Sequence, residues 1–245
     1  MSDVVPPRPD RPEQPSRQVV PWHPIESLPV FLIAALVGGV LGAPILAATG
    51  SRSIRYAALL VTGDIGLIAT VLFWVRYVKR APLASLGMPR EPVRDVVTGL
   101  LGGGAIILAS AIAVAVEQAV ARGVLGHELT SPSQVPTYVS GLVLVLLAPA
   151  VILVAPLGEE LLFRGFLYRG LRSSLPVWAS AIVSAVLFGL VHLAGGLALW
   201  PIVPPLMIVG IGLALVYERR QSLLASITAH ALFNLVGFIA IVMSR

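Results

Sequence analysis

The chain has 245 residues, of which 57% are hydrophobic, only 12% are charged and none is cysteine. In soluble domains about a quarter of the residues are charged, so this chain has too few polar side chains to cover a water-facing surface. We therefore expect lipid to be part of its solvent. The lack of cysteine excludes disulfides, thiolate metal sites and a cysteine nucleophile. The net charge of +5 does not predict nucleic-acid binding, because the basic residues lie between apolar runs rather than along one stripe.

The first 28 residues are polar, carry mixed charge and contain seven prolines, from Pro6 to Pro24. A segment of this composition cannot bury enough apolar surface to offset the entropy lost on folding. We predict a disordered tail over residues 1–28.

Long apolar runs dominate the rest of the chain. A helix needs about 20 apolar residues to cross a hydrocarbon core of roughly 30 Å. One run is long enough for two spans and is interrupted by Gly195, Gly196 and three prolines, so we predict an all-α bundle of seven transmembrane helices. An eighth, re-entrant or amphipathic piece over residues 157–172 is left open. The runs are 27–51, 57–75, 96–116, 129–158 with an apolar core from residue 138, 173–217 and 221–244.

The basic residues predict the orientation of these spans. With the N-terminus in the cytoplasm and the sides alternating, 13 of the 17 Lys and Arg residues lie on the cytoplasmic side and four on the other. This bias has the sign of the positive-inside rule. We expect an integral protein of a bacterial-type cytoplasmic membrane. The spacings Gly38-x-x-x-Gly42 and Gly99-x-x-x-Gly103 also predict close approach of helix backbones.

The first polar cluster inside the apolar runs is Glu159-Glu160 followed by Arg164. An ionisable residue at the bilayer centre costs about 2.5–3.5 kcal/mol on insertion scales and usually faces the bundle interior. Glu160 and Arg164 are four residues apart and can form an ion pair. Glu159 lies about 100° further round the helix, free for acid–base chemistry. The alternative is an ordinary helix end with Arg164 extending to the interface.

Two further polar clusters contain histidine: Phe188 with His192, and His230 with Asn234, each pair at a spacing of four residues. A lone histidine in a membrane helix is more often a hydrogen-bonded packing group than a catalyst. Three separate polar motifs in apolar runs are nevertheless better explained by one shared polar site.

Glu-Glu-x-x-x-Arg, then Phe-x-x-x-His, then His-x-x-x-Asn on successive helices resembles the CPBP family, the CAAX prenyl proteases of the Rce1-like type and the bacterial Abi proteins. The resemblance covers roughly residues 140–240, and the first three spans match only as apolar helices. It implies an intramembrane protease with N-terminal helices over residues 29–137 and a catalytic membrane domain over residues 138–245.

The resemblance also implies roles for the motif residues. Glu159 would be the general base and His192 its partner on the water, while His230 and Asn234 would stabilise the oxyanion. Glu160 and Arg164 would orient the first motif helix. Phe188 is expected to support the site by packing.

A metal is the open question for this site. Glu159, His192 and His230 could hold a zinc ion with a bound water, or the same groups could act without metal. A His-Glu-x-x-His helix is absent from the sequence, which excludes zincin geometry. The balance favours no tightly bound catalytic metal.

The sequence also bears on other protease classes and on non-catalytic functions. The sequence has no Gly-x-Ser loop for a serine protease, and Asp64 is the only aspartate in a predicted span, whereas an aspartyl protease needs two. We expect Asp64 to be a packing or interface group. A non-catalytic immunity or scaffold protein of the same fold, or a small proton-coupled transporter, remain alternatives. For a protease, the expected substrate is a membrane-anchored or C-terminal peptide, and the expected active site opens toward the cytoplasm.

Overall fold

The computed structural model describes residues 20–89, 91–130 and 133–245, and all regular elements in this part of the chain are helical. Seven helices are long and apolar enough to cross a membrane, which confirms the predicted fold class and the number of spans. The protein is an integral membrane protein. The spans are Pro24–Ala48, Arg52–Val78, Pro92–Leu125, Gly141–Arg172, Val177–Gly195, Leu197–Arg220 and Leu223–Met243.

Several spans combine more than one helical element. In chain order the elements are η1 (Pro24–Glu26), α1 (Ser27–Ala48), α2 (Arg52–Phe73), η2 (Trp74–Val78), η3 (Leu83–Leu86), α3 (Pro92–Leu125), α4 (Gly141–Pro149), η4 (Ala150–Val154), α5 (Ala155–Glu160), η5 (Leu161–Tyr168), α6 (Arg169–Arg172), α7 (Val177–Val191), η6 (His192–Gly195), η7 (Leu197–Ile202), α8 (Val203–Arg220) and α9 (Leu223–Met243).

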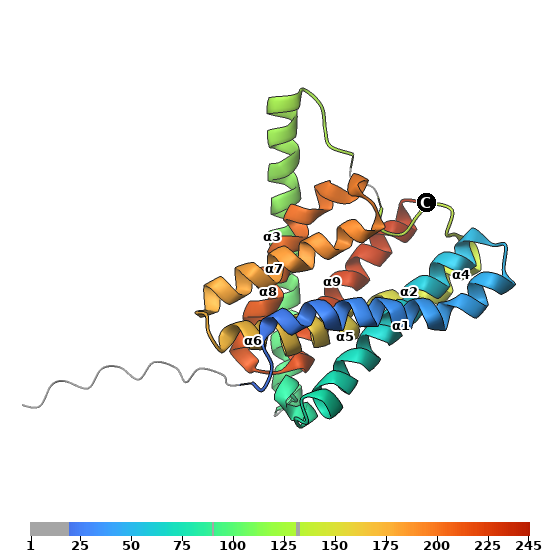
Figure 1. The fold of residues 1–245 in the computed structure, drawn as a ribbon. Coiled ribbons are helices and arrows are strands. Elements are labelled where there is room, and N and C mark those ends of the chain that lie inside the picture. Colours follow the sequence, from blue (N-terminus) through green and yellow to red (C-terminus); the bar gives the residue numbers. More distant parts are fainter. Residues whose placement is uncertain (1–19, 90, 131–132) are drawn as a thin grey trace, which may run out of the picture.

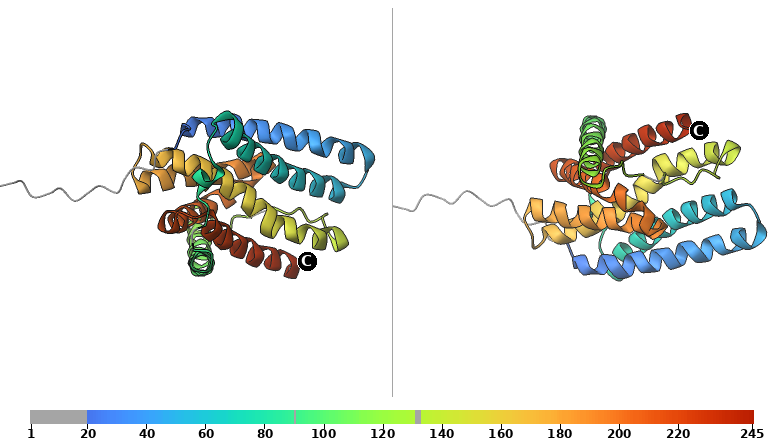
Figure 2. Two further views of the ribbon diagram at one scale, coloured as in Figure 1. Left: turned by 90° about the horizontal axis from the view of Figure 1, so that it is seen from below. Right: turned by 90° about the horizontal axis from the view of Figure 1, so that it is seen from above.

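Most helices run in similar directions, and α3 crosses them steeply. The antiparallel pair α1 and α2 lies along one side of the bundle (Figure 1). Helix α3 is seen nearly end-on in both views of Figure 2, where α1, α2 and α9 extend along the plane. It packs against α8 and α9, so the helix that carries His230 and Asn234 is braced from outside the site.

Both predicted small-residue motifs lie where helices touch. A Cβ atom added to Gly38 on α1 would come within 2.8 Å of the Gly63 Cα atom on α2, and one added to Gly42 would meet Thr62. On α3, an added Cβ at Gly99 would lie 2.5 Å from the Ala225 carbonyl oxygen, and one at Gly103 would lie 3.0 Å from that of Ala229. The predicted close approach of helix backbones is therefore confirmed for both motifs.

Gly99→Ala is expected to destabilise the protein by about 1–3 kcal/mol, because the added methyl group would overpack a backbone contact that cannot move aside. Gly104→Ala on the same helix is the matched control, since an added Cβ there meets nothing within 4 Å. Thermal unfolding of both variants in detergent measures the difference. Equal stabilities would contradict the packing of α3 on α9.

The predicted disordered tail is shorter than expected within the described residues. Residues 1–19 lie outside them, but residues 20–28 are ordered. Trp22 is 3% exposed, its indole Nε1 donates to the Phe166 carbonyl at 2.9 Å, and its ring stacks on that of Phe166. His23 and Glu26 form a capping box at η1. The buried Trp22 ring therefore anchors residues 20–28 to the bundle, although the first 28 residues as a whole are polar and rich in proline.

The structure defines two boundaries that the sequence left open or approximate: the extent of the fourth span and the division of the long uncharged run. The region 157–172 is not a separate eighth segment but the second half of one continuous span, Gly141–Arg172. The long uncharged run divides at Gly196, as predicted. Its φ of 128° and ψ of 148° form a backbone conformation that is essentially restricted to glycine.

Polar bonds distinguish the two ends of the bundle. At one end, Arg172 forms an ion pair with Glu218 at 3.2 Å, and Arg220 forms one with Asp95 at 2.7 Å. At the opposite end, where α2 begins, the Tyr56 hydroxyl donates to the Gln134 carbonyl at 2.9 Å. The connection between α3 and α4 therefore lies at the end opposite the Arg172–Glu218 and Arg220–Asp95 ion pairs.

Candidate active site

The two adjacent glutamates lie on α5, a single short α-helical segment between the π-helical segments η4 and η5. π-Helical turns are rare and often occur at functional sites. Pro156 lies at the start of α5 and has no N–H to donate. In a π-helix the N–H of each residue donates to the carbonyl five residues earlier. For position 156 that acceptor is the Val151 carbonyl, which Pro156 leaves without a backbone donor. The Asn234 Nδ2 atom donates to that carbonyl at 2.8 Å instead, so α9 satisfies a backbone group that the proline frees.

Glu160 and Arg164 form the ion pair that their spacing predicts. The Arg164 Nη1 atom lies 2.6 Å from Glu160 Oε1, and both side chains are completely buried. Arg164 also donates from Nη2 to the Gly210 carbonyl on α8 at 3.0 Å, and its guanidinium lies over the Phe188 ring. The pair therefore links the fourth span to α7 and α8.

His230 on α9 is held between the two glutamates. Its Nδ1 atom lies 3.0 Å from Glu160 Oε1, and its Nε2 atom lies 3.7 Å from Glu159 Oε2. The shorter contact is a hydrogen bond, while the longer one exceeds that range. Because the ionised Glu160 accepts, Nδ1 carries a proton, and Glu160 positions the ring so that Nε2 faces Glu159.

His192 follows the last turn of α7 and is oriented by its own helix. Its Nδ1 atom lies 2.8 Å from the Phe188 carbonyl oxygen. A carbonyl only accepts hydrogen bonds, so Nδ1 is the protonated nitrogen and Nε2 is left to interact with the cavity that His192 lines. The Phe188 ring, 1% exposed, makes edge contacts with both His192 and His230. Phe188 thus spaces the two imidazoles.

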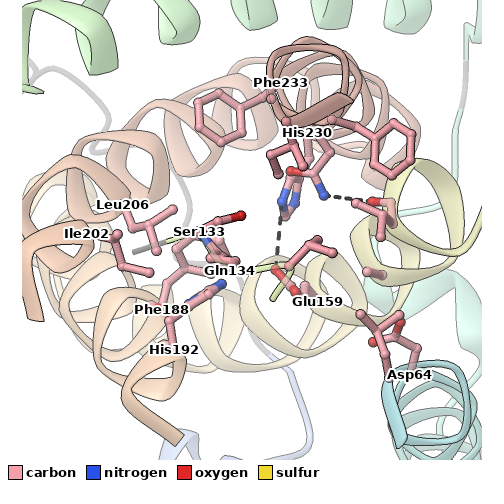
Figure 3. Close-up of a pocket in the computed structure, with 18 of the residues that line it drawn as sticks. Asp64, Ser133, Gln134, Glu159, Phe188, His192, Ile202, Leu206, His230 and Phe233 are labelled. Atoms are coloured by element: carbon pink, nitrogen blue, oxygen red, sulfur yellow. Dashed lines mark hydrogen bonds and ion pairs between the residues drawn. The ribbon is translucent and has the colours of Figure 1, made fainter. Parts of the chain in front are cut away.

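Glu159 and His192 line the same cavity, which has a volume of about 430 Å³ (Figure 3). His230 and Asn234 line it as well, so the structure brings the four predicted catalytic residues to one hollow. The Glu159 Oε2 atom is buried and has no hydrogen-bond partner. The remaining lining residues include Tyr56, Leu60, Asp64, Ser133, Gln134, Val135, Val151, Ala155, Phe188, Ile202, Leu206, Phe233, Gly237, Phe238 and Ile241.

A second cavity, of about 280 Å³, adjoins the first. It lies between α1, α2 and α7, and its walls also contain Asp64, Glu159 and His192. Glu159 and His192 therefore lie where the two cavities meet.

The predicted zinc ligands do not form a metal site in the described part of the chain. Both imidazoles have Nδ1 engaged and Nε2 available, the arrangement that metal-binding histidines use. However, no three His, Asp or Glu side chains within residues 20–89, 91–130 and 133–245 are grouped so that they could hold an ion. Glu159, His192 and His230 as placed do not fit a zinc ion, and we derive no chemical step through one.

Asp64 is the site residue that sequence reasoning missed. It was expected to pack or mark an interface, yet it lies in the walls of both cavities, and its Oδ2 atom is buried without a partner. Its position as the only aspartate of a predicted span was the available signal. Its proximity to Glu159 depends on the packing of α2 against α5, which the sequence does not reveal.

The comparisons with known proteins agree with this placement. Residues 141–236 match the model of the type II CAAX prenyl endopeptidase Rce1-like family. This part of the chain is similar to the Rce1-like family. The match has nearly the extent that the sequence motifs indicate, and it contains every motif residue from Glu159 to Asn234. The chain is therefore a membrane protein with a region similar to CAAX proteases.

One curated relative also matches. The UPF0177 protein YxdF of Lactococcus lactis subsp. lactis (strain IL1403) is 33% identical over 89 residues. The aligned stretch covers 36% of this chain and 46% of that protein, so the chain spans about half the length of the curated relative it matches. No solved structure gives a significant match.

Proposed function

We propose that the protein is an intramembrane endopeptidase that hydrolyses a peptide bond with a water activated by Glu159 and His192. The observation that carries the proposal is the unpartnered Glu159 Oε2 atom in a cavity that His192 also lines. A carboxylate oxygen without a hydrogen-bond donor, in the same cavity as an oriented imidazole, suits general-base chemistry.

The two acceptors define how the water is used. Glu159 and the Nε2 atom of His192 each accept one hydrogen of the water, which directs an oxygen lone pair at the peptide carbonyl. Glu159 takes the proton as the oxygen attacks the carbonyl carbon. The protonated Glu159 then gives this proton to the amide nitrogen as the C–N bond breaks, leaving a carboxylic acid and an amine, and proton exchange between them gives a carboxylate and an ammonium group. The proton count balances without a co-reactant.

The oxyanion is stabilised from α9. Asn234 uses one N–H on the Val151 carbonyl, and its second N–H is available to the developing negative charge. His230 can donate from Nε2 only as an imidazolium, because its Nδ1 proton is directed at Glu160. Glu160 thus supports the oxyanion role of His230 by compensating the positive charge of the ring.

The substrate is proposed to be a membrane-anchored or C-terminal peptide, since the cavity lies among membrane spans. Trapping tests this proposal. Glu159→Gln protein, incubated with membranes, should retain peptides that the wild-type protein cuts, and mass spectrometry should recover the cut products from the wild type alone. If both proteins return the same uncut peptides, the protein is a scaffold rather than a protease.

The orientation in the membrane is a further part of the proposal. The charge bias supports a cytoplasmic N-terminus, but the larger cavity reaches Ser133, Gln134 and Val135, at the end opposite the Arg172–Glu218 and Arg220–Asp95 ion pairs. With that orientation we propose that the larger cavity opens away from the cytoplasm, in place of the cytoplasmic opening expected from the sequence.

Single cysteines in this cysteine-free chain test the orientation. A cysteine at the exposed Ser174 should react with an impermeant thiol reagent from the cytoplasmic side, and one at the exposed Ser133 from the opposite side. Labelling of both from the same side would contradict the arrangement, and exchange of the two sides would reverse it.

A further inference from the structure

Asp64 has a position that the proposed reaction does not use. It lies on α2, and its backbone carbonyl oxygen is 3.4 Å from where a Cβ of Gly158 would be. The turn of α5 that carries Glu159 therefore packs directly against α2 at Asp64. In the view of Figure 3, Asp64 lies on the side of Glu159 away from His192. It is fixed beside the catalytic candidates by contact between two backbones.

The charge of Asp64 has no structural explanation within the described residues. Its Oδ2 atom is buried and without a hydrogen-bond partner, and no ion pair is formed by Asp64 among the described residues, whereas Asp95 pairs with Arg220 through Oδ1. A carboxylate inside a membrane bundle is costly and usually faces a partner, a cavity or a pathway. Asp64 faces two cavities, so its partner should be something that enters them.

The charge balance of the cavities indicates what that partner is. Asp64 and Glu159 are both acidic, and no Lys or Arg belongs to the described residues that line either hollow. The nearby Glu160 forms an ion pair with Arg164, and an imidazolium at His230 would offset only one of the two acids. The walls therefore present excess negative charge in apolar surroundings, where an electrostatic preference for a cation is strong.

We propose that Asp64 is a specificity-determining residue that binds a lysine or arginine side chain of the substrate close to the scissile bond. This inference rests on the proposed protease function and adds a substrate class to it. The peptide carbonyl is held between Glu159 and His192, and the cationic side chain extends past Glu159 to Asp64. The alternative, in which Asp64 shares a proton with Glu159 during hydrolysis, is an outcome of the test.

Two matched peptides distinguish binding of a cationic side chain by Asp64 from proton sharing between Asp64 and Glu159. One peptide of leucine and alanine residues carries a central lysine, and its twin carries norleucine, which keeps the methylene chain but lacks the ammonium group. The ratio of their cleavage rates is measured for the reconstituted full chain. We expect the wild type to favour lysine about tenfold or more. Asp64→Asn should bring the ratio close to one, while Glu117→Gln, another membrane carboxylate outside both cavities, should leave it unchanged.

Charge reversal and binding complete the design. Asp64→Lys should shift the preference from the lysine peptide to a glutamate peptide. The affinities of the lysine and norleucine peptides are also measured on Glu159→Gln protein, where no cleavage is required, and the same lysine preference is expected. A ratio unaffected by Asp64→Asn, with both rates reduced equally, would overturn the proposal and assign Asp64 to proton transfer. Binding preference for lysine without cleavage by the wild type would instead overturn the protease function alone.

Discussion

Glu159→Gln is expected to lower the rate of peptide cleavage by about 10²–10⁴-fold, the range that general acid–base catalysis contributes. Glutamine keeps the shape of the side chain but cannot take a proton from water. The variant should fold normally, since the lost carboxylate has an unpartnered Oε2 atom in the membrane. Cleavage of a peptide recovered by trapping, measured beside thermal unfolding, gives both quantities.

Glu117→Gln is the control for this substitution. Glu117 is also a carboxylate within a membrane span, with both oxygens buried and unpartnered, and it lies outside both site cavities. The Glu117→Gln protein should cleave the peptide at the wild-type rate. If Glu159→Gln also retained that rate, Glu159 would not be the base, and a non-catalytic scaffold would become the better account.

Arg164→Met is expected to destabilise the protein by about 3–5 kcal/mol. The substitution leaves Glu160 as an uncompensated charge at a completely buried position, and removal of one partner of a buried pair has a cost of this size. Unfolding in detergent at increasing denaturant measures the loss.

The double variant Arg164→Met with Glu160→Gln tests the physical cause. Because it removes both charges, it should recover a large part of the stability, although His230 loses its acceptor. The contrary result is a double variant that is even less stable than Arg164→Met. In that case the uncompensated charge of Glu160 would not explain the loss of stability.

Much of the site could be predicted from residue spacing. The four-residue separation of Glu160 and Arg164 correctly indicated their ion pair, and the 100° offset correctly left Glu159 facing elsewhere. Both are local properties of a helix. The same holds for Gly99, whose spacing from Gly103 indicated a close helix contact.

Other features depend on contacts between distant segments. His230 and Asn234 share a face of α9, but one is bonded to Glu160 and the other to the Val151 carbonyl. That carbonyl is available because η4 is π-helical and Pro156 follows it, a local change of pairing that apolar patterning does not reveal. The ordering of Trp22 by Phe166 is likewise a contact across 144 residues.

The roles of the two imidazoles also required the structure. The family resemblance implied that His230 stabilises the oxyanion, and a neutral imidazole N–H was expected to serve as the donor. The hydrogen bond from its Nδ1 atom to Glu160 means that a neutral ring would present a lone pair at Nε2. His192 presents its Nε2 lone pair because Nδ1 is bonded to the Phe188 carbonyl. The Nδ1 partner is a carboxylate for His230 and a neutral carbonyl for His192, a difference that the sequence does not reveal.

The source of the oxygen in the new carboxyl terminus is the most direct test of the central claim that Glu159 and His192 activate a water. Wild-type protein is given a trapped peptide in ¹⁸O-water containing hydroxylamine, and the products are analysed by mass spectrometry after a single turnover. We expect the new carboxylate to carry oxygen from water and no hydroxamate to form, because no acyl-enzyme intermediate occurs. Hydroxamate at the new terminus would reveal a covalent nucleophile and contradict the account.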